Sequence, residues 1–127
     1  MKFKENNRPI YLQIAETICD GVMNGTLREG ERIPSVREYA ASMAVNPNTV
    51  MRTYEHLSHS GIIANRRGIG FFVTDHAREL ILRTRQESFL GDEINDFFRR
   101  LSLMGITPSE LSARYADYLK SNRNSGD

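Results

Sequence analysis

The chain has 127 residues, of which 39% are hydrophobic and 26% charged, and its formal net charge is +1. This length allows one modest core, and the near-neutral total charge does not by itself indicate a nucleic-acid partner. Because no apolar run approaches the roughly 20 residues that a membrane helix needs, and no signal-peptide core opens the chain, we expect a soluble, cytoplasmic protein with no membrane partner.

A helix is expected from about Pro9 to Gly25. Proline is tolerated in a first helical turn and glycine is a common stop. The polar residues 1–8 before it are expected to be loose. Apolar residues recur along the helix at every fourth position, at Ile10, Ile14, Ile18 and Val22.

Two capped helices with a short turn between them come next. Ser35, with Glu38 three residues later, has the pattern of a capping box at the start of a helix that ends near Ala44. Asn46 followed by Pro47 marks the start of a second helix. This spacing is typical of a helix-turn-helix, whose second helix enters the major groove of DNA.

A basic β-hairpin follows these helices. Ile62-Ile63 and Phe71-Phe72-Val73 have the composition of strands, and the segment 65–70 between them supplies two glycines for a tight turn. Surface charges such as Arg66 and Arg67 contribute little to stability, but they suit a phosphate backbone or a minor groove. The order of elements therefore predicts a winged helix-turn-helix that binds double-stranded DNA.

The start of the second motif helix is the end that we expect to contact DNA. Free backbone N–H groups there suit a phosphate, asparagine can pair with adenine edges, and a threonine methyl can meet a thymine methyl. Capping alone would explain the helix starts, but it would not explain the wing arginines. The expected DNA-binding residues are Ser35, Arg37, Asn46, Pro47, Asn48, Thr49, Arg52, Arg66, Arg67 and Gly68.

The pattern changes to purely helical beyond Thr74. One helix is expected from about Asp75 to Met104, and Thr107 caps another, followed from Ser121 by a polar, disordered tail. The apolar stripe of this region either packs, on the first domain or across a dimer, or lines a small-molecule site; packing is favoured because two helices rarely enclose a pocket. The residues expected at a dimer interface are Phe89, Ile94, Phe97, Phe98 and Leu101.

These elements predict a mainly α fold with a small β-hairpin. Residues 1–74 would form the winged helix-turn-helix DNA-binding domain, and residues 75–127 a short two-helix dimerisation region with a disordered tail. His56 and His59 lie three apart, but a structural zinc site wants four ligands, so no metal, cofactor or catalytic site is expected. The alternative function is a winged helix that docks on a protein; the polar start of the second motif helix disfavours it.

The motifs resemble the GntR family of bacterial transcription regulators. The resemblance covers about residues 9–74 and implies that Arg37, the start of the recognition helix and the wing tip touch DNA. The segments that carry it are residues 9–14, 30–37 and 48–50, with Tyr54, Leu57, Gly61 and residues 67–70.

Two further features are similar to the YtrA subfamily of that family. One is the segment 49–54, in which Met51 and Arg52 stand where many members have a different pair, and the other is the short region after Thr74. This similarity implies a dimeric repressor, often of transporter operons, that binds an inverted repeat. The implied partners are double-stranded DNA and a second copy of the chain, and an unidentified small-molecule effector is left open.

Overall fold

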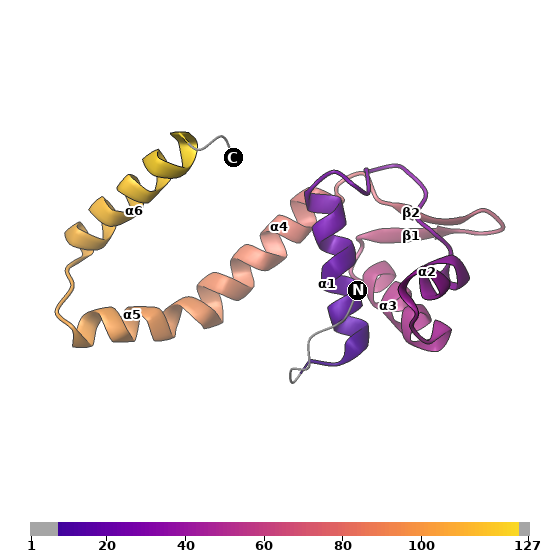
Figure 1. Cartoon of the computed structure of the whole chain (residues 1–127), viewed down its shortest axis with the longest axis horizontal. Helices are drawn as coiled ribbons and strands as arrows, with labels where there is room; N and C mark the ends of the chain where they lie inside the picture. Colours follow the sequence, from indigo (N-terminus) through magenta and orange to yellow (C-terminus); the bar gives the residue numbers. More distant parts are fainter. Residues whose placement is uncertain (1–7, 125–127) are drawn as a thin grey trace. The chain divides into compact units, whose positions relative to one another are not determined.

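The computed structural model describes residues 8–124 and divides the chain into two compact units that meet between Thr84 and Arg85. It is mainly helical with one antiparallel hairpin, which confirms the predicted fold class. No described helix is both long and apolar enough to cross a membrane. The elements are α1 (Ile10–Met23), α2 (Val36–Met43), α3 (Pro47–His59), β1 (Ile63–Arg66), β2 (Gly70–Val73), α4 (Ala77–Ser88), the π-helical segment η1 (Phe89–Glu93), α5 (Ile94–Leu103) and α6 (Pro108–Asn124) (Figure 1).

The core lies in the first unit, where α1 and α3 pack against each other and against the hairpin. Val50, Tyr54 and Leu57 lie on one face of α3 and are buried, as the helical period requires. Ala77 and Ile81, four residues apart at the start of α4, are buried in the same core. The first compact unit therefore extends to Thr84 rather than ending at residue 74.

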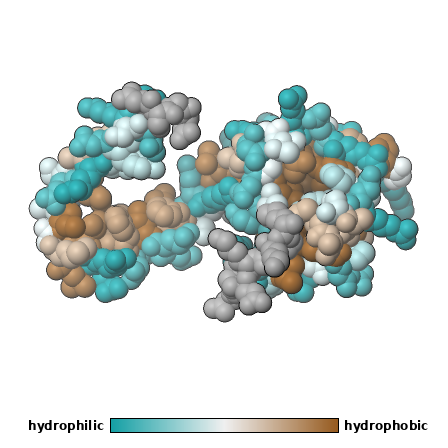
Figure 2. Space-filling model, in the orientation of Figure 1, coloured by the Kyte–Doolittle hydropathy of each residue, from teal (hydrophilic) through white to brown (hydrophobic). Residues whose placement is uncertain are grey.

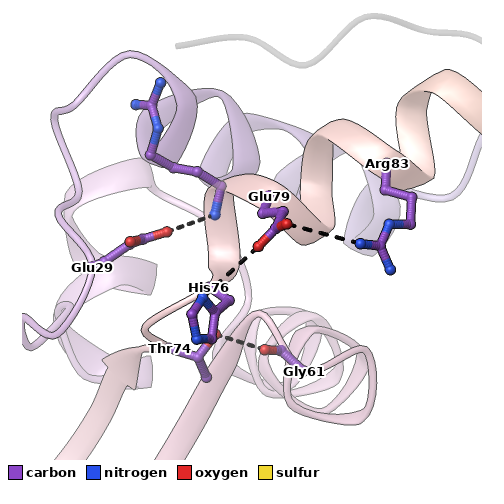
Figure 3. A network of polar contacts seen from close by, with 7 residues as sticks. Glu29, Gly61, Thr74, His76, Glu79 and Arg83 are labelled. Carbon is purple, nitrogen blue, oxygen red and sulfur yellow. Dashed lines mark hydrogen bonds and ion pairs between the residues drawn. The ribbon is translucent and has the colours of Figure 1, made fainter.

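Polar contacts fix the start of α4 to the rest of the first unit (Figure 3). The Thr74 hydroxyl donates to the Gly61 carbonyl oxygen at 2.7 Å, which joins the end of β2 to the end of α3. The backbone N–H of Arg78 donates to the Glu29 carboxylate at 2.9 Å. This bond satisfies a first-turn donor of α4 that has no acceptor within the helix.

The second unit differs from the expected pattern in two ways. The helix expected from 75 to 104 is interrupted by η1, whose wider turn rotates the residues after it relative to those before it. A periodicity of 3.6 in the sequence does not reveal such a turn. The expected disordered tail is wrong for residues 121–124, which continue α6. Residues 125–127, and the N-terminal residues 1–7, lie outside the described part of the chain.

Candidate nucleic-acid interface

The start of α2 leaves hydrogen-bond donors exposed. Ser35 Oγ accepts the backbone N–H of Glu38 at 3.1 Å, and Glu38 Oε1 accepts the backbone N–H of Ser35 at 2.9 Å, so the predicted capping box is confirmed. The hydrogen bond from the Ser35 backbone is the main cause of the lowered pKa of Glu38, which stays ionised. Within residues 8–124, the N–H groups of Val36 and Arg37 have no acceptor. They suit an anion beside this helix end.

The start of α3 is capped more completely than the sequence suggests. Asn46 is the N-cap and Pro47 the first helical residue, as expected. However, Asn46 Oδ1 accepts the N–H of Asn48 at 2.8 Å, and the Asn46 carbonyl accepts the N–H of Thr49 at 3.0 Å. The expectation of free backbone N–H groups at this end is therefore wrong, because proline has none and the cap occupies the next two. What α3 offers instead is its side chains, with Asn48 exposed and Thr49 half-buried.

The wing is a short hairpin with a basic tip. Arg66 pairs with Gly70, and the N–H of Ile69 donates to the Arg66 carbonyl at 2.9 Å to close the turn. Gly68 has a φ of +79°, which a type II turn requires at its third residue. Arg67 precedes it in the turn and is exposed, and within residues 8–124 it has no ion-pair partner.

Buried contacts join α2, α3 and the wing into one rigid body. The Tyr54 hydroxyl, on α3, donates to the Pro34 carbonyl just before α2 at 2.7 Å. The Tyr54 ring meets the Phe71 ring of β2 edge-on at 5.0 Å between centroids. The N–H of Ile33 donates to the Phe71 carbonyl at 2.9 Å. The exposed ends of the three elements are thus held in a fixed arrangement, which a recognition surface needs.

The two remaining arginines of the predicted site are held by aromatic rings. The Arg52 guanidinium carbon lies 4.1 Å from the centroid of the Tyr11 ring, and that of Arg66 lies 4.3 Å from the Phe72 ring. Both distances are typical of cation–π contacts. Sequence reasoning assigned no role to Tyr11 or Phe72. For Phe72 a signal was present, since it lies diagonally across the hairpin from Arg66 on the same face.

Arg32 lies in the segment 30–37 and is not among the expected DNA-binding residues, but the structure places it beside the wing. It forms an isolated bridge with Phe72, and its side chain lies so close to Gly70 that a Cβ there would be 2.8 Å from Arg32 Nε. The positive charge of Arg32 also lowers the pKa of Glu38, as a smaller cause. Arg32 is therefore a further basic group beside the wing, close to Gly70.

The described residues give little support to a metal site at His56 and His59. The His56 ring meets Tyr11 edge-on at 6.0 Å between centroids. Across residues 8–124, no group of three or more histidine, cysteine, aspartate or glutamate side chains is placed to hold a metal ion.

Comparison with known proteins identifies the part of the first unit from α1 to the wing. The family model described as bacterial regulatory proteins of the GntR family matches residues 10–73, from α1 to the end of the wing. The uncharacterized HTH-type transcriptional regulator YhcF of Bacillus subtilis is 35% identical over 84% of this chain and 87% of its own length. The HTH-type transcriptional repressor YtrA of the same organism is 35% identical over 61% of this chain and 59% of its own.

A solved structure extends the likeness beyond the wing. The crystal structure of a GntR-family transcriptional regulator from Bacteroides thetaiotaomicron is 49% identical and covers 88% of this chain and 98% of its own, with a TM-score of 0.81. These relatives are named as transcriptional regulators and not as enzymes. The chain belongs to the GntR family of bacterial regulatory proteins and is a DNA-binding transcription regulator with a winged helix-turn-helix.

Proposed function

We propose that this regulator is a dimeric repressor that reads an inverted-repeat operator with one winged helix on each half-site. The observation that carries the proposal is the rigid connection of the α2 start, the α3 start and the wing through the buried Tyr54. A two-fold dimer presents two such surfaces, and linking them raises affinity without new contacts.

The contacts divide by the chemistry of each group. Asn48 and Thr49 on α3 read base edges, with Arg37 beside them as a specific contact. The donors of Ser35 and the α2 start, and the wing residues Arg66, Arg67 and Gly68, contact phosphates, which position the protein without reading sequence. Asn46 caps α3 through its side-chain oxygen and can donate to DNA only through its amide NH2, whereas Pro47 has no N–H and fixes the first turn.

The dimer proposal rests on the apolar side chains that residues 85–123 leave unburied. None of residues 85–123 is buried, so this unit has no core of its own. On α5, apolar residues at spacings of three and four form one stripe, and Figure 2 shows hydrophobic surface over this helix. An open hollow of about 450 Å3 between α5 and α6 would accept a partner's apolar side chain. The proposed interface residues are Phe89, Ile94, Phe97, Phe98 and Leu101.

Repression, a transporter operon and a cytoplasmic location are proposed by analogy. The relative YtrA is named as a repressor, and a regulator of bacterial genes acts where the chromosome lies. A small-molecule effector is compatible with this scheme, but no described feature argues for its chemistry.

The dimer can be tested with matched variants of the full chain. Phe97→Asp and Phe98→Asp place a charge in the α5 stripe, whereas Leu103→Asp places one on the opposite face of α5 at a side chain that is 75% exposed. Sedimentation should show a dimer for the wild type and for Leu103→Asp, and a monomer for the two stripe variants. A monomeric wild type, or stripe variants that still dimerise, would contradict the proposal.

DNA binding is tested by mobility shift and footprinting on the region upstream of the chain's own gene. We expect a protected site with two-fold symmetry. A winged helix that docks on a protein would give no protected site on any DNA at physiological salt.

A further inference from the structure

Arg52 and Tyr11 form an exposed contact that the proposed half-site reading does not use. Tyr11 lies in the first turn of α1 and Arg52 lies in the second turn of α3, with the guanidinium carbon 4.1 Å from the ring centroid. The two elements are locked together beneath this contact, because the buried Thr53 hydroxyl donates to the Tyr11 carbonyl at 2.8 Å. This bond ties the Tyr11 backbone to α3, and the Tyr11 ring also meets the His56 ring of α3 edge-on at 6.0 Å.

The place of Arg52 on α3 puts it in the reading face. Residues four apart on a helix lie on one side, so Arg52 follows Asn48 on the exposed face of α3. Tyr11 draws the guanidinium toward α1, at the edge of that face rather than over its middle. A cation at the edge of a helix that lies in the major groove meets the phosphate backbone.

We infer that Tyr11 is a positioning residue that holds Arg52 ready to contact a DNA phosphate on the α1 side of the recognition helix. This inference rests on the proposed DNA-binding function. A free arginine side chain loses rotamer freedom when it binds, and a ring that already orders the guanidinium reduces that loss. The wing has the same arrangement, with the Arg66 guanidinium over the Phe72 ring.

The test is a double-mutant cycle on operator binding with the full chain. Tyr11→Leu removes the ring but keeps an apolar side chain, and Tyr11→Phe keeps the ring as the conservative control. We expect Tyr11→Leu to weaken binding about two- to tenfold for each half-site, the range that one more ordered side chain represents, while Tyr11→Phe binds like the wild type. In an Arg52→Ala background, Tyr11→Leu should have no further effect.

The salt dependence of operator binding distinguishes the positioning role of Tyr11 from the phosphate contact of Arg52. Arg52→Ala should lower the slope of log K against log salt by about 1.8, because the dimer loses one phosphate contact in each of the two half-sites. Tyr11→Leu should leave the slope unchanged, because the charge is still present. Equal losses from Tyr11→Leu with and without Arg52 would overturn the inference, since Tyr11 would then act only on the fold. If Arg52→Ala changed the preference for operator over scrambled DNA but not the slope, the phosphate assignment would be overturned.

The failure of the two proposals can be told apart. If the DNA-binding proposal fails, the wild type binds no operator. If only the positioning inference fails, the wild type binds and the cycle shows no coupling. Thermal melting of each variant shows whether a loss of affinity comes from unfolding.

Discussion

Tyr54→Phe should weaken both the fold and the interface, because one buried hydroxyl joins α3 to the start of α2. Tyr54 is fully buried, and its hydroxyl donates to the Pro34 carbonyl at 2.7 Å. The substitution keeps the ring and its contact with Phe71 but removes the donor to the Pro34 carbonyl, in a bond that is partly buried. The expected loss is about 0.5–1.5 kcal/mol of unfolding free energy.

The assay is urea unfolding followed by circular dichroism, with Tyr39→Phe as the matched control. The Tyr39 ring also meets Tyr54 edge-on, at 6.3 Å, but its hydroxyl has no hydrogen-bond partner within residues 8–124. Tyr39→Phe should therefore change the unfolding free energy by less than about 0.5 kcal/mol. The reasoning would be refuted if Tyr54→Phe lost no more unfolding free energy than Tyr39→Phe.

The burial of Tyr54 also predicts that the stability of the fold depends on pH in the alkaline range. Burial raises the pKa of Tyr54 well above its ordinary value. As the pH rises past about 10, the unfolded chain loses this proton while the folded chain keeps it, so stability falls. Below that pH the contribution is fully present. The stability of Tyr54→Phe should fall less steeply than that of the wild type over this range.

Two further predictions concern the wing and the α2 cap. Arg67→Ala should weaken binding to operator and scrambled DNA alike and lower the salt slope by about 1.8, one phosphate contact for each half-site. Binding titrations at several salt concentrations would show a change in specificity instead if Arg67 reads bases. The lowered pKa of Glu38 means that the capping box stabilises the fold above the ordinary glutamate pKa and loses this effect as the pH falls through the lowered value. Glu38→Gln should remove that part of the acid dependence in thermal melts, and an unchanged profile would show that the box contributes nothing.

The sequence predicts the first unit well because its signals are local. Capping residues such as Ser35 and Asn46 act on N–H groups two or three positions away, and their bonds are those expected. The resemblance to the GntR family adds many spaced positions that agree together. Local patterns do not show that the Asn46 cap leaves no free N–H group for DNA at residues 48 and 49.

The parts that sequence reasoning missed depend on contacts between distant segments. Tyr11 and Arg52 are 41 positions apart, and nothing in either segment indicates that one lies over the other. The burial of Ala77 and Ile81 likewise depends on the packing of α4, which moves the end of the first unit to Thr84. The π-helical turn at η1 breaks a pattern that appears continuous in the sequence.

The central claim is that Arg37 and the side chains at the start of α3 read a specific DNA sequence. The most direct measurement is the ratio of affinities for the footprinted operator and a scrambled duplex, by fluorescence anisotropy. Asn48→Ala and Arg37→Ala should each reduce this ratio, by about 1–3 kcal/mol per lost base contact, with thermal midpoints near that of the wild type. Arg114→Ala, which removes an exposed arginine of α6, should leave the ratio unchanged. A ratio that is the same in all four proteins would contradict the account.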